Sequence, residues 1–180
     1  MATIERVLAE HPFFEGFSEA HVKLVAGCAS DVRFKPGQII FRVGEEAKKF
    51  YLVRQGKVAL QMTSERRGPL TVLTVGAGEV LGWSWLFPPH KYRFSARVLE
   101  ATRGFEIDGQ CLRGKAEQDH DFGYHLLKHW SPVVERALDA TRLQLVNVYQ
   151  DRWAGWVPLS TVTSDHGKGG SPWRFINKML

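Results

Sequence analysis

The chain has 180 residues, of which 44% are hydrophobic, so it is long enough to bury the core of one globular domain. Its first residues carry charge where a secretory signal needs an apolar run, and no later apolar stretch can cross a bilayer, so we expect a soluble, cytoplasmic chain. A formal net charge of +5 favours anionic partners only weakly, because basic and acidic residues are interspersed. Two cysteines, Cys28 and Cys111, fit neither a disulfide framework nor a zinc site, which predicts two reduced thiols.

Two short helices are expected at the N-terminus. Ile4, Val7 and Leu8 follow the spacing of one helical face. Ser18 provides an N-cap for the second helix, although His21 stands where a capping box needs Glu or Gln.

From Val32 the hydrophobic pattern becomes that of β-strands separated by glycine turns. The predicted strands cover residues 32–34, 38–43, 50–53, 57–62, 70–75 and 97–107. Residues 65–68 are expected to form a polar hairpin tip. Short strands at such regular spacing favour an antiparallel barrel or sandwich.

After Ile107 the pattern returns to that of helices. A mostly apolar seam follows a seven-residue period, with two further positions offset by four: Leu127, Val134, Thr141 and Val148, then Leu138 and Leu145. Such a seam packs either on the chain's own strands or on a second copy, and we expect a homodimer through residues 121–149. Pro132 interrupts the stretch, and Ser131 as its N-cap predicts a shorter helix followed by a long one.

A candidate anion-binding segment lies between the strands. It runs from Gly78 to Trp85 and continues, after a proline-containing connection, at residues 93–98. Free amides at a short helix N-terminus can hold one phosphate charge, a glycine such as Gly82 permits close backbone approach, and an arginine adds a forked donor pair.

The order of these features resembles the sensory, cyclic nucleotide-binding domain of the catabolite activator family. The residues that carry the resemblance are Gly37, Ile40, Phe41, Gly44, Tyr51, Gly56, Lys57, Val58, Gly78, Glu79, Ser95, Ala96 and the helix ending at residues 141–145. The resemblance implies an α+β fold over residues 1–150: an eight-stranded antiparallel β-roll, or jelly-roll-like double-stranded β-helix, with N-terminal helices and a long C-terminal helix. It also implies that cAMP or cGMP binds inside the roll and that the flanking helices move on binding.

The same resemblance assigns a ligand site. The implied ligand-binding residues are Gly78, Glu79, Val80, Gly82, Arg93, Ser95 and Ala96, with Glu79 matched to the ribose 2′-hydroxyl and Ser95 and Ala96 to the phosphate. One departure stands out: Phe94 holds the place of the family arginine, and Arg93 lies one residue earlier. Because strand side chains alternate between faces, this shift turns the guanidinium away from its expected direction unless Arg93 curls back or Arg97 replaces it.

Trp83, Trp85 and Phe87 follow the first part of this segment. They either form a stacking wall for a flat ligand or fill the cavity that a nucleotide would occupy, and filling is the favoured interpretation.

We therefore expect a non-enzymatic sensory module that binds a cyclic nucleotide, first of all cAMP, and signals through its C-terminal helix. The alternatives are a ligand-free roll used for protein interaction, or a sensor of another anionic or flat metabolite. None of the histidines lies on a predicted strand, and neither a catalytic motif nor a cofactor motif is present, so no catalytic residue, metal or cofactor is expected.

The last segment, residues 151–180, is predicted to be a partly irregular, tryptophan-containing tail because glycines and prolines interrupt it. In the catabolite activator family a helix-turn-helix domain follows at this point. The tail is too short for one, so we expect neither direct sequence-specific DNA binding nor membrane contact.

Overall fold

The computed structural model describes residues 3–64 and 68–152. The chain divides into two units, Met1–Leu145 and Val146–Leu180, and the roll with its helices belongs to the first. The predicted hairpin tip at residues 65–68 and the tail at 151–180 lie largely outside the described residues, so both stay predictions. No helix among the described residues is long and apolar enough to cross a membrane.

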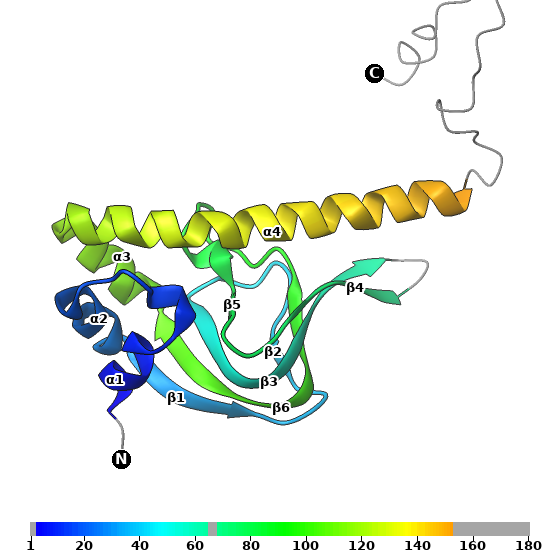
Figure 1. The fold of residues 1–180 in the computed structure, drawn as a ribbon. Helices are drawn as coiled ribbons and strands as arrows, with labels where there is room; N and C mark the ends of the chain where they lie inside the picture. The colour runs from blue at the N-terminus through cyan, green and yellow to red at the C-terminus, as the bar shows by residue number, and fades with distance from the viewer. Residues whose placement is uncertain (1–2, 65–67, 153–180) are drawn as a thin grey trace, which may run out of the picture. The chain divides into compact units, whose positions relative to one another are not determined.

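Three short helical segments begin the chain: α1 (Ile4–Ala9), the 3-10 helix η1 (Pro12–Phe14) and α2 (Glu19–Ala26). The Ser18 hydroxyl accepts a hydrogen bond from the His21 amide at 3.2 Å, which confirms the predicted N-cap. In Figure 1 these segments lie beside β1, on the side of the roll where α3 is also found.

Six antiparallel strands form the roll: β1 (Ala29–Phe34), β2 (Ile39–Phe41), β3 (Lys49–Ser64), β4 (Gly68–Val75), β5 (Val80–Leu81) and β6 (Ser95–Asp108). The main path of the sheet is β1-β6-β3-β4, while β2 pairs with β6 and β5 pairs with β3. The predicted fold class is confirmed, with six strands in the described part of the chain where eight are expected.

Strand β3 joins two segments that the sequence predicts as separate strands. The glycine between them, Gly56, has a φ of 95° and lies where the register with β6 shifts, so the chain bends without leaving the sheet. A Cβ atom at this position would lie 2.5 Å from the Ala101 carbonyl oxygen and from the Thr102 hydroxyl. The turn signal is therefore real, but it marks a bulge rather than a strand end.

Two helices follow the roll: α3 (Gly109–Gln118), capped by Asp108, and α4 (His120–Arg152). Pro132 lies inside α4, so the predicted division at Ser131 is wrong. The Ser131 hydroxyl does not cap a helix but donates to the Leu127 carbonyl one turn earlier, at 2.9 Å. Helical packing on both sides of Pro132 outweighs the backbone hydrogen bond that proline cannot donate.

The leucines of the predicted α4 seam are exposed, whereas Val134 and Thr141 are partly buried. Leu127, Leu138 and Leu145 are each about half exposed, at 49%, 51% and 57%. The buried face of α4 is a different one, formed by Phe122, Leu126, Trp130 and Ala137. Packing on the chain's own strands therefore does not account for the seam; Val148 lies outside the described side chains.

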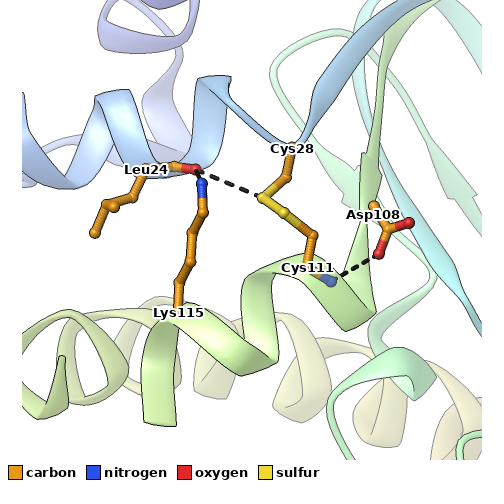
Figure 2. Close-up of a disulfide and its surroundings, with 5 residues drawn as sticks. All are labelled: Leu24, Cys28, Asp108, Cys111 and Lys115. Carbon is orange, nitrogen blue, oxygen red and sulfur yellow. Dashed lines mark hydrogen bonds between the residues drawn. A yellow bond between two sulfur atoms is a disulfide. The ribbon is translucent and has the colours of Figure 1, made fainter. Parts of the chain in front are cut away.

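The expected pair of reduced thiols is also wrong, because Cys28 and Cys111 form a disulfide (Figure 2). The antiparallel register of β1 and β6 places Ala29 opposite Ile107, and the Asp108 amide donates to the Cys28 carbonyl at 2.9 Å. Since α3 begins directly afterwards, Cys111 comes within a Cα–Cα distance of 6.0 Å of Cys28. This proximity depends on strand register and is invisible at a sequence separation of 83 residues.

Candidate functional site

The candidate site is built around the turn that follows β5. Gly82 adopts a left-handed conformation with a φ of 92°, and the 3-10 helix η2 (Trp83–Trp85) begins directly after it. A Cβ atom on Gly82 would lie 3.3 Å from the Lys49 carbonyl oxygen and from the Phe50 Cα atom. Positive φ and close backbone approach together explain why glycine stands here.

The tryptophan that ends η2 is part of the protein core. Trp85 is fully buried, stacks on Phe50 at a ring distance of 4.9 Å and packs edge-on against Trp130 of α4 at 5.9 Å. Trp83 is half-buried and Phe87 is exposed. These rings thus do not form a common stacking wall. Trp85 packs in the core against Phe50 and Trp130, and Trp83 is the member of the three that lines the small space beside Gly82.

The space between η2 and the roll is almost closed. Its volume is only about 10 Å³, and it is lined by Phe41, Leu60, Gly82, Trp83, Ser84, Tyr92, Arg93 and Phe94. A space of that size holds about one water molecule. Ligand pockets usually measure some 300–1,000 Å³, so no nucleotide fits in this conformation.

Two aromatic rings fill the mouth of the roll. Phe41 and Tyr92 stack at 3.8 Å with an interplanar angle of 10°, and both are buried. The Tyr92 hydroxyl donates to the Lys49 carbonyl at 2.7 Å. Burial raises the pKa of Tyr92 to about 12, so the phenol stays neutral. Sequence analysis misses Tyr92 because the connection before Arg93 has no regular pattern.

Two of the predicted ligand residues line this small space, whereas Ser95 and Ala96 do not. Gly82 and Arg93 line it, but the Arg93 side chain is exposed to solvent. The Ser95 hydroxyl accepts from the Val43 amide at 3.1 Å, and Ala96 is fully buried where β6 pairs with β2 and β3. Phe94 is half-buried and packs against the core.

The other three predicted residues lie in a different place. Gly78 and Glu79 belong to the turn before β5, Val80 is the first residue of β5, and all three line a separate groove beside α4. The Glu79 carboxylate accepts from the Gly76 amide at 2.6 Å and forms an ion pair with Arg136 of α4. The structure therefore does not bring Glu79 together with Gly82 and Arg93.

A sequence signal for this arrangement is available in the spacing of the glycines. In the family that the chain resembles, a Gly-Glu pair opens the phosphate-binding cassette, which corresponds here to the candidate anion-binding segment at residues 78–85 and 93–98. The glycine directly before η2, however, is Gly82. Trp83 follows it, and an indole cannot accept a ribose hydroxyl proton as a carboxylate can. Gly78 and Glu79 have the residue types of the family pair, but they lie in the turn before β5 and not in the turn that begins η2.

The groove beside α4 has a volume of about 510 Å³. Its floor is apolar and its rim carries Glu79, Lys128, His129 and Arg136. Both ring nitrogens of His129 lie 2.8 Å from backbone carbonyls, of His125 and Glu15, so this ring fixes the N-terminal segment to α4. The sequence pattern does not predict this groove, because its walls come from segments that are far apart in the sequence.

Comparison with known proteins agrees with this fold. Residues 31–119 match the model of the cyclic nucleotide-binding domain. The CRP-like cAMP-activated global transcriptional regulator of Mycobacterium tuberculosis is 23% identical over 147 residues, which cover 81% of this chain and 63% of the regulator. The chain thus spans less than two thirds of that relative.

Solved structures give the same result. A protein of Geobacter metallireducens GS-15, described provisionally as cyclic nucleotide-binding, is 28% identical with a TM-score of 0.68, covering 77% of this chain and 99% of its own. The N-terminal domain of a Streptomyces coelicolor transcriptional regulator is 22% identical with a TM-score of 0.60, covering 75% of this chain and 94% of its own.

The chain therefore carries, at residues 31–119, a domain of the cyclic nucleotide-binding family, as its resemblance to the catabolite activator sensory domain predicts. The family and these relatives are regulatory domains and transcriptional regulators rather than enzymes.

Proposed function

We propose that this chain is a regulatory interaction module whose roll is filled by its own aromatic side chains, and that it associates with a second copy through the exposed seam of α4. The observation that carries the proposal is the volume of about 10 Å³ left between η2 and the roll. It corresponds to the second of the functions that the sequence leaves open.

The stacked rings of Phe41 and Tyr92 oppose the entry of a nucleotide. Opening the roll for a nucleotide exposes both rings, and burying one large apolar side chain is worth about 1.5–3 kcal/mol. The stacked geometry adds about 0.5–1.5 kcal/mol. A nucleotide has to offset this cost without a cation inside the roll, since the Arg93 side chain is exposed. Losing two charge-assisted hydrogen bonds weakens binding by roughly a hundredfold to ten-thousandfold.

The proposed association with a second copy is based on the exposed leucines of the α4 seam. Leu127, Leu138 and Leu145 recur along α4, and the described part of the chain leaves each about half exposed. Apolar residues at heptad spacing pack well against an equivalent helix. A second copy of the chain satisfies this requirement because it presents the same seam.

Titration calorimetry on the full chain tests the ligand part. We expect no saturable heat with cAMP or cGMP up to millimolar concentration, for the wild type and for Arg93→Ala alike. Saturable binding with a dissociation constant below about 0.1 mM, an affinity near −5.5 kcal/mol, contradicts a filled roll.

Sedimentation analysis tests the association part. The wild type is expected to be a dimer, and Leu138→Asp is expected to be a monomer because it places a charge in the seam. Asp139→Asn, at the exposed neighbouring position, is the matched control and should stay dimeric. A monomeric wild type rejects this part of the proposal.

Cyclic nucleotide binding, first of all of cAMP, is the second candidate. Gly82 keeps the turn that opens a short helix, and Arg93 lies at the mouth of the closed space. The Mycobacterium tuberculosis relative is described as activated by cAMP. In that case cAMP has to displace Tyr92, and Tyr92→Ala should tighten its binding at least tenfold in the same calorimetric experiment.

A further inference from the structure

Helix α3 connects the roll to α4 and also touches the cassette. Its N-cap, Asp108, is the last residue of β6, and Asp119 separates its end from α4. The Arg113 guanidinium donates a hydrogen bond to the Trp85 carbonyl of η2. Gly109 lies so close to the same tryptophan that an added Cβ would be 2.8 Å from its ring. A displacement of α3 therefore acts on both η2 and α4.

A disulfide attaches the first turn of α3 to the junction between α2 and β1 (Figure 2). It joins Cys28 to Cys111. One turn further along α3, the Lys115 ammonium group donates to the Leu24 carbonyl at 2.6 Å. Covalent and polar contacts thus converge on the end of α2 and hold α3 against it.

The surroundings also suit the two reduced thiols. Both cysteines are half-buried, so small reagents can reach them from solvent. Cys111 lies in the first turn of α3, where the helix N-terminus stabilises a thiolate. The Cys28 sulfur is 3.6 Å from the Leu24 carbonyl oxygen, which can accept a hydrogen bond from the thiol after reduction. The Cys28 thiol therefore keeps a polar partner after reduction.

We propose that Cys28 and Cys111 form a redox-controlled clamp on α3. In the disulfide state α3 is fixed to α2; in the dithiol state it is free to shift, and the shift is passed to η2 and α4. Disulfides in a reducing compartment are usually transient and often sense redox state, which is the role expected if the chain is cytoplasmic, as its sequence predicts. The clamp goes beyond the proposed function, because it depends neither on the contents of the roll nor on association.

A low-molecular-weight thiol opens the clamp in two exchange steps. Its thiolate attacks the Cys28 sulfur, forms a mixed disulfide and expels the Cys111 thiolate, which takes up a proton. A second reductant thiolate attacks the mixed disulfide, releases the Cys28 thiolate for protonation and leaves as the oxidised reductant. The protein gains two electrons and two protons, and a small disulfide such as oxidised glutathione reverses both steps.

The test compares oxidised and reduced full-length chain. After oxidised glutathione we expect no cysteine to react with a maleimide under native conditions, and after dithiothreitol we expect two to react, counted by mass. Amide hydrogen exchange in residues 109–118 should become on the order of tenfold faster on reduction, because α3 opens locally. Exchange in β3 and β6, which requires opening of the whole roll, reports the change in global stability separately.

The double variant Cys28→Ser, Cys111→Ser is the matched control: its α3 should exchange like that of the reduced wild type, with or without dithiothreitol. The reduced wild type carries the same information if this variant fails to fold. Two reactive thiols after oxidised glutathione, or equal α3 exchange in both states, overturn the clamp. Calorimetry and sedimentation on the same samples judge the proposed function separately, so either proposal can fail alone.

Discussion

Gly82 fixes the start of η2 through its backbone alone. Replacing it by alanine forces a side chain into a left-handed conformation and brings its Cβ to 3.3 Å from the backbone of β3. We expect Gly82→Ala to lower the free energy of unfolding by about 1–3 kcal/mol, measured by urea denaturation.

Gly114 provides the matched control for that substitution. It lies inside α3, and an added Cβ would meet nothing within 4 Å. Gly114→Ala should raise the free energy of unfolding by about 0.5–1 kcal/mol, because alanine is the better helix former. Equal effects of the two substitutions would mean that the left-handed turn is not required.

His11 makes the stability depend on pH. Its Nδ1 atom accepts from the Phe13 amide at 3.2 Å, and burial, with a smaller contribution from the nearby Arg54 charge, lowers the pKa of His11 below 6.5. Between the folded pKa and 6.5, the unfolded chain binds a proton that the folded chain does not, so stability rises with pH across this window. Stability is lost as the pH falls below 6.5.

His11→Asn isolates this effect, because asparagine can still accept from the Phe13 amide. The wild type should lose up to about 1.4 kcal/mol more than the variant for each pH unit within the window. Urea denaturation of both proteins from pH 7.5 down to 5 measures the difference. Parallel stability curves would show that His11 is not the responsible group.

At the scale of elements, α4 has two features that are unusual for a helix of a globular domain. It continues through Pro132, and it keeps an exposed apolar seam beside its buried face. The Lys128 carbonyl, four residues before the proline, is denied its usual amide donor. The helix persists because Trp130 and Phe122 anchor it in the core on the N-terminal side of the interruption.

Pro132→Ala restores the missing donor. We expect the free energy of unfolding to rise by about 1–3 kcal/mol, and the thermal midpoint to rise with it. Glu135→Gln, at an exposed position of the same helix, should stay within about 0.5 kcal/mol of the wild type. A loss of stability in Pro132→Ala would show that α4 needs the interruption to fit the roll.

At the scale of the whole molecule, the disulfide between Cys28 and Cys111 constrains the unfolded chain. The two cysteines are 83 positions apart, and the loop that the disulfide closes contains the strands of the roll. Reduction should lower the free energy of unfolding by roughly 4–5 kcal/mol in the chain-entropy model. Thermal unfolding with and without dithiothreitol measures this loss, and the double serine variant should not respond to the reductant. An unchanged midpoint in the wild type would mean that the link adds nothing to global stability.

The roll, its two flanking groups of helices and its family follow from local patterns in the sequence. Alternating apolar residues between glycines specify strands, and Ser18 specifies the start of α2, because these signals act within a few residues. The order of the glycines around the cassette is sufficient to indicate the family, because each glycine permits one backbone turn. Gly78 and Gly82 both have a positive φ, so the residue type alone does not separate them, and only the spacing to Trp83 does.

Tertiary structure alone decided what the cassette encloses and which distant groups meet. The Phe41–Tyr92 stack closes the roll, the Arg93 side chain remains in solvent, and Glu79 pairs with α4 because packing between segments far apart in the chain sets these directions. The register between β1 and β6 likewise brings Cys28 to Cys111. Each of these contacts joins residues that are far apart in the sequence, so no hydrophobic period predicts it. Strands and helix caps, in contrast, are determined by neighbouring residues.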